Sequence, residues 1–457
     1  MEVRHIQHLY NRIGFGITPN KLEELTSIPK EKVVQSILLS SKNFTPLTID
    51  TSFLTQLRPS DVKKKSKRKE LMKISRKKIR ELNAAWIHRL ANPSELLREK
   101  MTLFWANHFV CESKNILFTQ QYNNMLRRYA LGDFRAFVKA MSKDPAMLTY
   151  LNNKQNKKRK PNENFARELL ELFTMGQGNY TETDIQESAR AFTGYNHNLK
   201  GEFTLRKKHH DYGTKTFFGK TGNFNGDEII DIILSQKQCA TYICSKIYRY
   251  FVNPEINKSH IDEMTAVFFS KYDIEELMRF ILESNWFYDK KNIGAKIKSP
   301  IELIIGIHNT VPFSVVKQKH QLLIQKLLGQ TLLKPPNVAG WKGGKTWIDS
   351  NTIVTRLRLP SILLNNAEIS YSELGGLKDN IKNYSSDRLR KKAFIKSNPN
   401  WKIFRDNYGN GTTEAFIKNI LSGPINAGTL QLISKNTSLS KQDLCVQLMS
   451  LPEYQLC

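Results

Sequence analysis

Several common signatures of enzyme chemistry are absent from this sequence of 457 residues. It contains no HExxH, P-loop, GxSxG or GxGxxG motif, so metalloprotease, nucleotide-binding and serine-hydrolase chemistries have no local support. Its five cysteines are odd in number and widely scattered, and they lack the CxxC spacing of a zinc or redox site. We therefore expect reduced thiols.

Long hydrophobic runs are also missing. No stretch of about 18 apolar residues occurs, so the sequence predicts no membrane span. The N-terminal segment MEVRHIQHLYNRIGFG lacks the apolar core of a signal peptide. We expect a cytoplasmic protein on this basis, and export together with a partner stays open.

Acidic residues are scarce: 42 of them face 70 basic residues, which gives a formal charge of +28. Such an excess attracts nucleic acid, anionic polymers or an acidic protein. Much of it lies between Lys63 and Arg80, which holds 11 basic residues and one acid, Glu70. The pattern predicts a helix with a basic outer face, which is either solvated or a docking surface for a polyanion. Its apolar seam would comprise Leu71, Ile74, Ile79, Leu82 and Trp86.

Helical periodicity dominates the rest of the chain. The only clear strand signals are GEFTLR and TKTFFG, between Gly201 and Gly219. We therefore predict a mainly α-helical fold with a large helical domain over residues 1–366, interrupted by a short β-hairpin-like segment near 201–219. The more polar residues 367–457 are predicted to form a smaller helical C-terminal region.

The segment PNENFARELLELFTMGQGNYTETD combines carboxylates, an arginine and leucines. We predict a helix from about Asn162 to Thr174 with Leu169, Leu172 and Phe173 buried, a stop at Gly176 and a capping box from Thr181 to Asp184. The spacing of Glu163, Arg167 and Glu168 fits a salt-bridged helix as well as the wall of an active site.

Two other segments carry candidate chemistry. In HHDYGTK, a turn around Gly213 could bring together His210, Asp211 and Lys215 for acid–base work or metal ligation, although such turns also use these residue types for their own hydrogen bonds. In FWANHF, His108 lies in an aromatic helix, where a core histidine is the common alternative.

Taken together, six stretches resemble the landmarks of the bacterial family called domain of unknown function 1800, in the same order and over Ile6 to Leu359. They are HLYNRIGFG, REKMTLFWANHFV, NENFARELLELFTMGQGNYTETDIQESARAFTGY, HDYGTKTFFGKTG, KSPIEL and PPNVAGW. The resemblance implies a predominantly α-helical protein. It also implies a gene neighbour from a second family, domain of unknown function 1501, whose members resemble phosphatases and sulfatases.

The family pattern falls on many polar residues, which favours a polar functional cleft. The matching positions are His8, Arg12, Gly16, Trp105, His108, Asn162, Glu163, Asn164, Arg167, Glu168, Glu171, His210, Asp211, Gly213, Lys215, Gly340 and Trp341.

Two classes of function follow. In the first, seven side chains converge on a cleft that binds or acts on an anionic or carbohydrate-like polymer, as an acid–base or metal-assisted hydrolase or as a ligand-binding protein. They are His108, Glu163, Arg167, Glu168, His210, Asp211 and Lys215. A His–carboxylate set is compatible with a divalent metal ion, although no ligand spacing requires one.

In the second class, the chain is a non-catalytic partner of the phosphatase- or sulfatase-like neighbour, and its polar residues form a buried network. We do not expect nucleic-acid binding from the sequence, because no recognised motif accompanies the charge.

Overall fold

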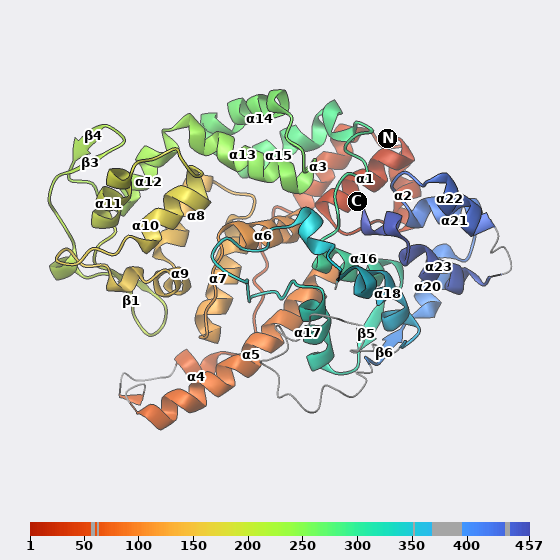
Figure 1. Ribbon diagram of the computed structural model, residues 1–457, viewed down its shortest axis with the longest axis horizontal. Coiled ribbons are helices and arrows are strands. Elements are labelled where there is room, and N and C mark those ends of the chain that lie inside the picture. Colours follow the sequence, from red (N-terminus) through yellow and green to blue (C-terminus); the bar gives the residue numbers. More distant parts are fainter. Residues whose placement is uncertain (56–59, 62–63, 351, 368–394, 435–438) are drawn as a thin grey trace.

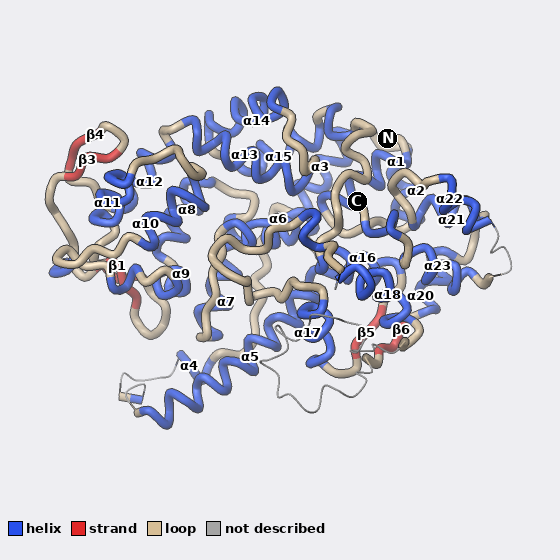
Figure 2. The backbone as a smooth tube through the Cα atoms, viewed as in Figure 1, coloured by secondary structure: helices blue, strands red, loops and turns tan. Residues whose placement is uncertain are grey.

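The computed structural model describes residues 1–457 except 56–59, 62–63, 351, 368–394 and 435–438. The fold is mainly α-helical, as predicted (Figure 1, Figure 2). None of the helices in the described ranges is long and apolar enough to cross a membrane.

The first half of the chain contains eleven α-helices within the described residues. They are α1 (Val3–Ile13), α2 (Pro19–Thr26), α3 (Lys30–Ser40), α4 (Ser52–Thr55), α5 (Lys65–Ala91), α6 (Leu96–His108), α7 (Ile116–Tyr129), α8 (Phe134–Lys143), α9 (Pro145–Tyr150), α10 (Asn164–Glu168) and α11 (Glu182–Ala191).

The second half continues with α12 (Gly226–Leu234), α13 (Lys237–Phe251), α14 (Lys258–Lys271), α15 (Ile274–Glu283), α16 (Pro300–Thr310), α17 (Gln318–Leu327), α18 (Thr352–Leu364), α20 (Trp401–Tyr408), α21 (Thr413–Ile420), α22 (Ala427–Ser434) and α23 (Lys441–Met449).

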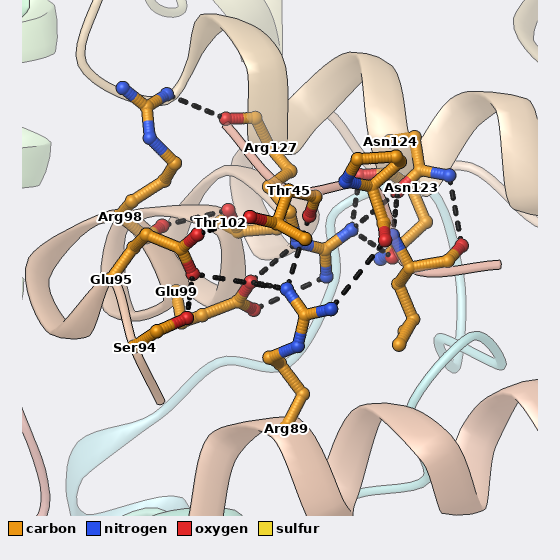
Figure 3. A network of polar contacts seen from close by, with 12 residues as sticks. Thr45, Arg89, Ser94, Glu95, Arg98, Glu99, Thr102, Asn123, Asn124 and Arg127 are labelled. Carbon is orange, nitrogen blue, oxygen red and sulfur yellow. Dashed lines mark hydrogen bonds and ion pairs between the residues drawn. The ribbon is translucent and has the colours of Figure 1, made fainter. Parts of the chain in front are cut away.

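Helix α6 lies in the interior, where α1, α3, α5 and α7 all contact it. Its residues from Leu97 to Trp105 are buried without exception, including the charged Arg98, Glu99 and Lys100. A helix buried on every side must satisfy its charges internally. Glu99 does so through a bond of 2.5 Å from Arg127 of α7, within a network that also includes Arg89 and Glu95 (Figure 3).

The strands form three antiparallel pairs in the described part of the chain. They are β1 (Tyr195–His197) with β2 (Phe203–Leu205), β3 (Lys215–Phe217) with β4 (Lys220–Gly222), and β5 (Phe313–Val315) with β6 (Ser397–Pro399). The two strand signals predicted near 201–219 are present but belong to different hairpins. Each pairs with a neighbour just outside the predicted segment, because a short local turn closes each pair.

The leucine-rich segment after Pro161 is helical from Asn164 to Thr174, but its last six residues, Leu169–Thr174, form π-helical turns. Leu169 and Phe173 are buried as predicted, whereas the prediction for Leu172 was wrong, because it is only half-buried. A π-turn shifts the residues that follow it around the helix axis, which moves Leu172 off the core face. The predicted stop at Gly176, with φ of +79°, and the Thr181–Asp184 capping box are both present.

Helix α5 confirms the predicted basic helix from Lys65 onward, while Lys63 lies outside the described residues. Leu71, Leu82 and Trp86 of the seam are buried, and Ile74 and Ile79 are half-buried. Most of its basic side chains are exposed, as they must be when they lack counterions.

The C-terminal helices pack beside α1 and α2 (Figure 1). Strand β6 pairs with β5, and Gln7 Nε2 donates to the Lys418 carbonyl at 2.9 Å. The predicted domain division between residues 366 and 367 stays a prediction.

Candidate functional site

Of the three candidate residues after Pro161, Arg167 and Glu168 lie on α10 and Glu163 is its N-cap. Arg167 donates to Glu163 at 3.2 Å and to both carboxylate oxygens of Glu182, on α11, at 2.8 and 2.9 Å. Within the described residues, no hydrogen bond or ion pair joins Glu168 to Arg167, and burial, followed by the charge of Glu171, raises the pKa of Glu168. Glu163, Arg167 and Glu182 thus form a partly exposed ion-pair group that connects α10 to α11.

The candidates from the HHDYGTK turn bond mostly within and around that turn. His210 is buried and its Nδ1 bonds the Thr193 carbonyl at 2.8 Å, while Asp211 accepts from Arg190 at 2.8 Å. The Lys215 ammonium donates to the backbone carbonyls of Asp211 and Gly213 at 2.8 and 2.9 Å. These bonds hold the turn in shape, as the alternative interpretation of such a turn anticipated.

Helix α11 separates these two groups. Glu182 in its first turn accepts a hydrogen bond from Arg167. On the other side, Arg190 donates to Asp211, and Glu187 accepts from the N–H of Thr216 on β3. Within the described ranges, no hydrogen bond or ion pair links the α10 candidates to those of the turn. The structure therefore brings the seven predicted side chains into three groups, with His108 as the third.

His108 stands at the end of α6 in a different environment. Its Nε2 lies 3.0 Å from the Phe173 carbonyl, which can only accept, so Nε2 carries the proton and Nδ1 of the neutral ring is an acceptor. Burial, and then the charge of Lys246, lowers the pKa of His108 to about 3. The ring is therefore uncharged at neutral pH and a weak base.

His108 lines a cleft of about 460 Å³. Its walls come from α6, the π-helical turn at Leu172, α13, the segment from Lys296 to Glu302 and the loop from Val338 to Trp347. Four aromatic side chains contribute to the wall: Phe104, Tyr250, Trp341 and Trp347. A concave site of this size with apolar walls and a few polar groups is typical of small-molecule or oligomer binding.

The loop is fixed against α6 by a reciprocal pair of hydrogen bonds. The Asn107 amide donates to the Trp341 carbonyl at 3.0 Å and accepts from the Trp341 N–H at 2.7 Å. Gly340 adopts φ of +74°, and a Cβ there would lie 2.9 Å from the Asn107 carbonyl oxygen. Only glycine permits this close approach, which places Trp341 at the cleft.

The charges of the cleft are mostly positive. Of the residues that the structure describes, four cations line it, Lys246, Arg249, Lys296 and Lys342, and one carboxylate, Glu302. Glu302 already accepts from Lys296 at 2.6 Å and from the buried Lys100 at 2.7 Å. In the part of the chain that the structure describes, Lys246, Arg249 and Lys342 form no ion pair.

The pKa values reflect this excess of cations. Burial favours neutral Glu302, but the charges of Lys100 and Lys296 hold its pKa far below the ordinary range. Burial lowers the pKa of Lys100 to about 8, with Glu302 opposing the change. The pKa of Lys246 is also lowered, first by burial and then by Arg249.

Sequence reasoning missed these charged residues. Lys100 and Glu302 lie inside two of the motif stretches, REKMTLFWANHFV and KSPIEL. They were not chosen as candidates because interactions within the first turns of a helix suffice to explain a charged residue near its start. Glu302 indeed completes a capping box with Ser299, whose N–H donates to it at 2.7 Å. Lys246, Arg249 and Lys342 lie outside the six stretches and had no sequence signal.

The described residues contain no group of three or more His, Cys, Asp or Glu side chains arranged to hold a metal ion.

Comparison with known proteins gives one match. Residues 8–456 match the family described as "Protein of unknown function (DUF1800)", which extends beyond the predicted limit at Leu359. No curated protein and no solved structure matches the chain. Because the match spans nearly the whole chain, the protein belongs to the DUF1800 family.

Proposed function

We propose that the cleft binds an anionic group, such as the carboxylate, sulfate or phosphate substituent of a carbohydrate-like polymer. One observation carries this proposal: among the described residues, four cations line the cleft, and the one carboxylate that lines it is already neutralised by two lysines. A bound anion would supply the missing negative charge in a partly desolvated site, where charge pairing is stronger than in bulk water.

The arrangement of the cations suits an anion that enters from outside. Arg249 and Lys342 are exposed, and Lys246 is half-buried with its ammonium 5.2 Å from the centre of the Tyr242 ring. Exposed cations such as Arg249 and Lys342 steer an anion towards a site, and a less hydrated cation such as Lys246 pairs with the anion there. The aromatic walls offer apolar area to the faces of sugar rings.

The same geometry favours binding over acid–base hydrolysis at this cleft. With a pKa of about 3, His108 is a poor general base at neutral pH. Glu302 stays ionised and keeps its hydrogen bonds from Lys100 and Lys296. The unprotonated Nδ1 of His108 can instead accept a hydrogen bond from a ligand hydroxyl.

Titration calorimetry with sodium sulfate and with trigalacturonate tests the proposal. We expect both probes to bind, and trigalacturonate to bind more tightly because it also contacts the aromatic wall. Lys246→Gln and Arg249→Gln should each weaken binding about tenfold, since a hydrogen bond to a charged group contributes about 1.5–3 kcal/mol.

Lys290→Gln is the matched control, because Lys290 is exposed and does not line the cleft. Equal affinities of all three variants and the parent protein would refute the proposal.

A further inference from the structure

A second concentration of positive charge lies on residues that do not line the cleft. Seven exposed cations occupy two turns, Lys157, Lys158, Arg159 and Lys160 in one and Arg206, Lys207 and Lys208 in the other. We call this set the hairpin basic patch. It lies beside the β1–β2 hairpin, at the left of Figure 1.

Tertiary contacts assemble the patch from segments almost 50 residues apart. The Lys158 N–H donates to the His209 carbonyl at 2.9 Å, and Gly194 bridges the two turns by donating to Asn156 and accepting from Arg206. Gly194 has φ of +78°, and a Cβ there would lie 2.8 Å from the Arg206 carbonyl oxygen. Glycine at this position is therefore what allows the two basic turns to meet.

The patch has no internal neutralisation. The acids that flank the two turns in sequence are Glu163, Glu202 and Asp211. Glu163 and Asp211 are bonded to Arg167 and Arg190, and Glu202 accepts from the side-chain amide of Asn198. Within the described ranges, none of the seven cations forms an ion pair. The half-buried Lys154 lies near the patch, because, after the larger effect of burial, the charge of Arg206 lowers its pKa.

The spacing of the cations indicates how dense a partner's charge must be. Residues 157–160 form a tight turn closed by the Lys160 N–H to Lys157 carbonyl bond, and 206–209 form a second closed turn. Each turn spans less than about 7 Å between its ends, so the seven Cα atoms lie within roughly 15 Å. Over that length a nucleic-acid duplex presents about nine phosphate charges, counting both strands.

We propose that the hairpin basic patch is a sequence-independent binding surface for duplex nucleic acid. A polysaccharide with one carboxylate on each sugar ring places fewer charges along the same length, so it matches seven cations less well. The patch contains lysine and arginine on exposed turns, which suits contacts to phosphates and not the reading of base edges. This inference does not depend on the proposed function of the cleft.

Fluorescence anisotropy with a labelled 20-base-pair DNA duplex of arbitrary sequence tests this proposal at several salt concentrations. The variant Lys157→Gln/Lys158→Gln/Lys207→Gln/Lys208→Gln should bind at least tenfold more weakly. The slope of log K against log salt should become shallower by about 3.6, which is 0.9 for each of four lost phosphate contacts.

The matched control removes the same charge from α5 through Lys65→Gln/Lys69→Gln/Lys73→Gln/Arg76→Gln. These four side chains are exposed and form no ion pair within the described residues. We expect the control to retain most of the affinity and slope. An equal loss in both variants would show that only net charge matters and would overturn the proposal.

A heparin octasaccharide and the single strand of the same DNA serve as competitors. The proposal requires the duplex to bind more tightly than either. Tighter binding of heparin that is lost in the patch variant would assign the patch to a sulfated polysaccharide and refute the proposal. Melting curves verify that both variants fold.

Discussion

Two buried ion clusters begin at neighbouring residues of α6, Glu99 and Lys100, and differ in charge balance. Around Glu99, two carboxylates face Arg127 and Arg89, and Arg98 donates to four backbone carbonyls (Figure 3). Around Lys100, Glu302 accepts from Lys100 and Lys296, and the negative charges of Glu302 and Cys457 also act on Lys298 and Arg356. The first cluster is complete, whereas the second has cations to spare.

The location of each cluster explains the difference. The Glu99 cluster joins α5, α6 and α7. An unpaired charge there would lower the stability of the fold and would not contribute to binding. The Lys100 cluster borders the cleft through Lys296 and Glu302, where an external anion can complete the balance. Under the proposed function, the cluster with an excess of one sign lies next to the anion site, and the balanced cluster is structural.

The largest effect is expected from Glu99→Gln. It leaves Arg127 buried without a carboxylate, which should lower the free energy of unfolding by about 3–5 kcal/mol. Urea denaturation measures the change. The double variant Glu99→Leu/Arg127→Met should lose less, because it leaves no buried unpaired charge. A double variant less stable than Glu99→Gln would contradict the structural role.

A smaller loss of stability, about 2 kcal/mol, is expected for Glu302→Gln, because Lys100 can release its proton more easily than an arginine can. At a pH low enough for Lys100 to keep its proton, the same substitution should raise the affinity for sulfate about tenfold, since one charge–charge repulsion is removed at close range. Denaturation and calorimetry report the two effects separately. Unchanged sulfate affinity would remove the proposed link between Glu302 and the cleft.

The pH dependence of sulfate binding should follow the lysines. Lys100 is protonated below its pKa of about 8 and loses its charge above it, so affinity should fall as the pH rises from 7 to 9. We expect about a tenfold decrease for one lost cation, whereas ordinary lysines would keep their charge up to about pH 10. Affinity that stays constant over this range would show that Lys100 does not influence the cleft.

The smallest effect is expected from Glu163→Gln on α10. Its side chain and that of Arg167 are each 38% exposed, and Arg167 retains Glu182 as a partner. Stability should change by less than about 1 kcal/mol, as for other partly exposed ion pairs. Sulfate affinity should not change. A tenfold loss of affinity would move the binding site from the cleft to α10.

Local sequence signals predicted much of the fold but little of the cleft. The capping box from Thr181 to Asp184, the stop at Gly176 and the seam of α5 depend on neighbours within a few residues, and all three are present. Of the seven candidate side chains only His108 lines the cleft, and Trp341, a position of the family pattern, lines it as well. Leu172 shows the limit of helical periodicity, because a π-turn changes which face a residue occupies.

The sequence by itself determined the helical class, the family and the excess of positive charge. Only the tertiary structure decided where the excess charge gathers. Lys246, Glu302 and Lys342 come from three separate segments, and the two turns of the hairpin basic patch meet at Gly194. Charge interactions act through space over distances that helical periodicity and motif spacing do not encode, so they become visible only once the chain is folded.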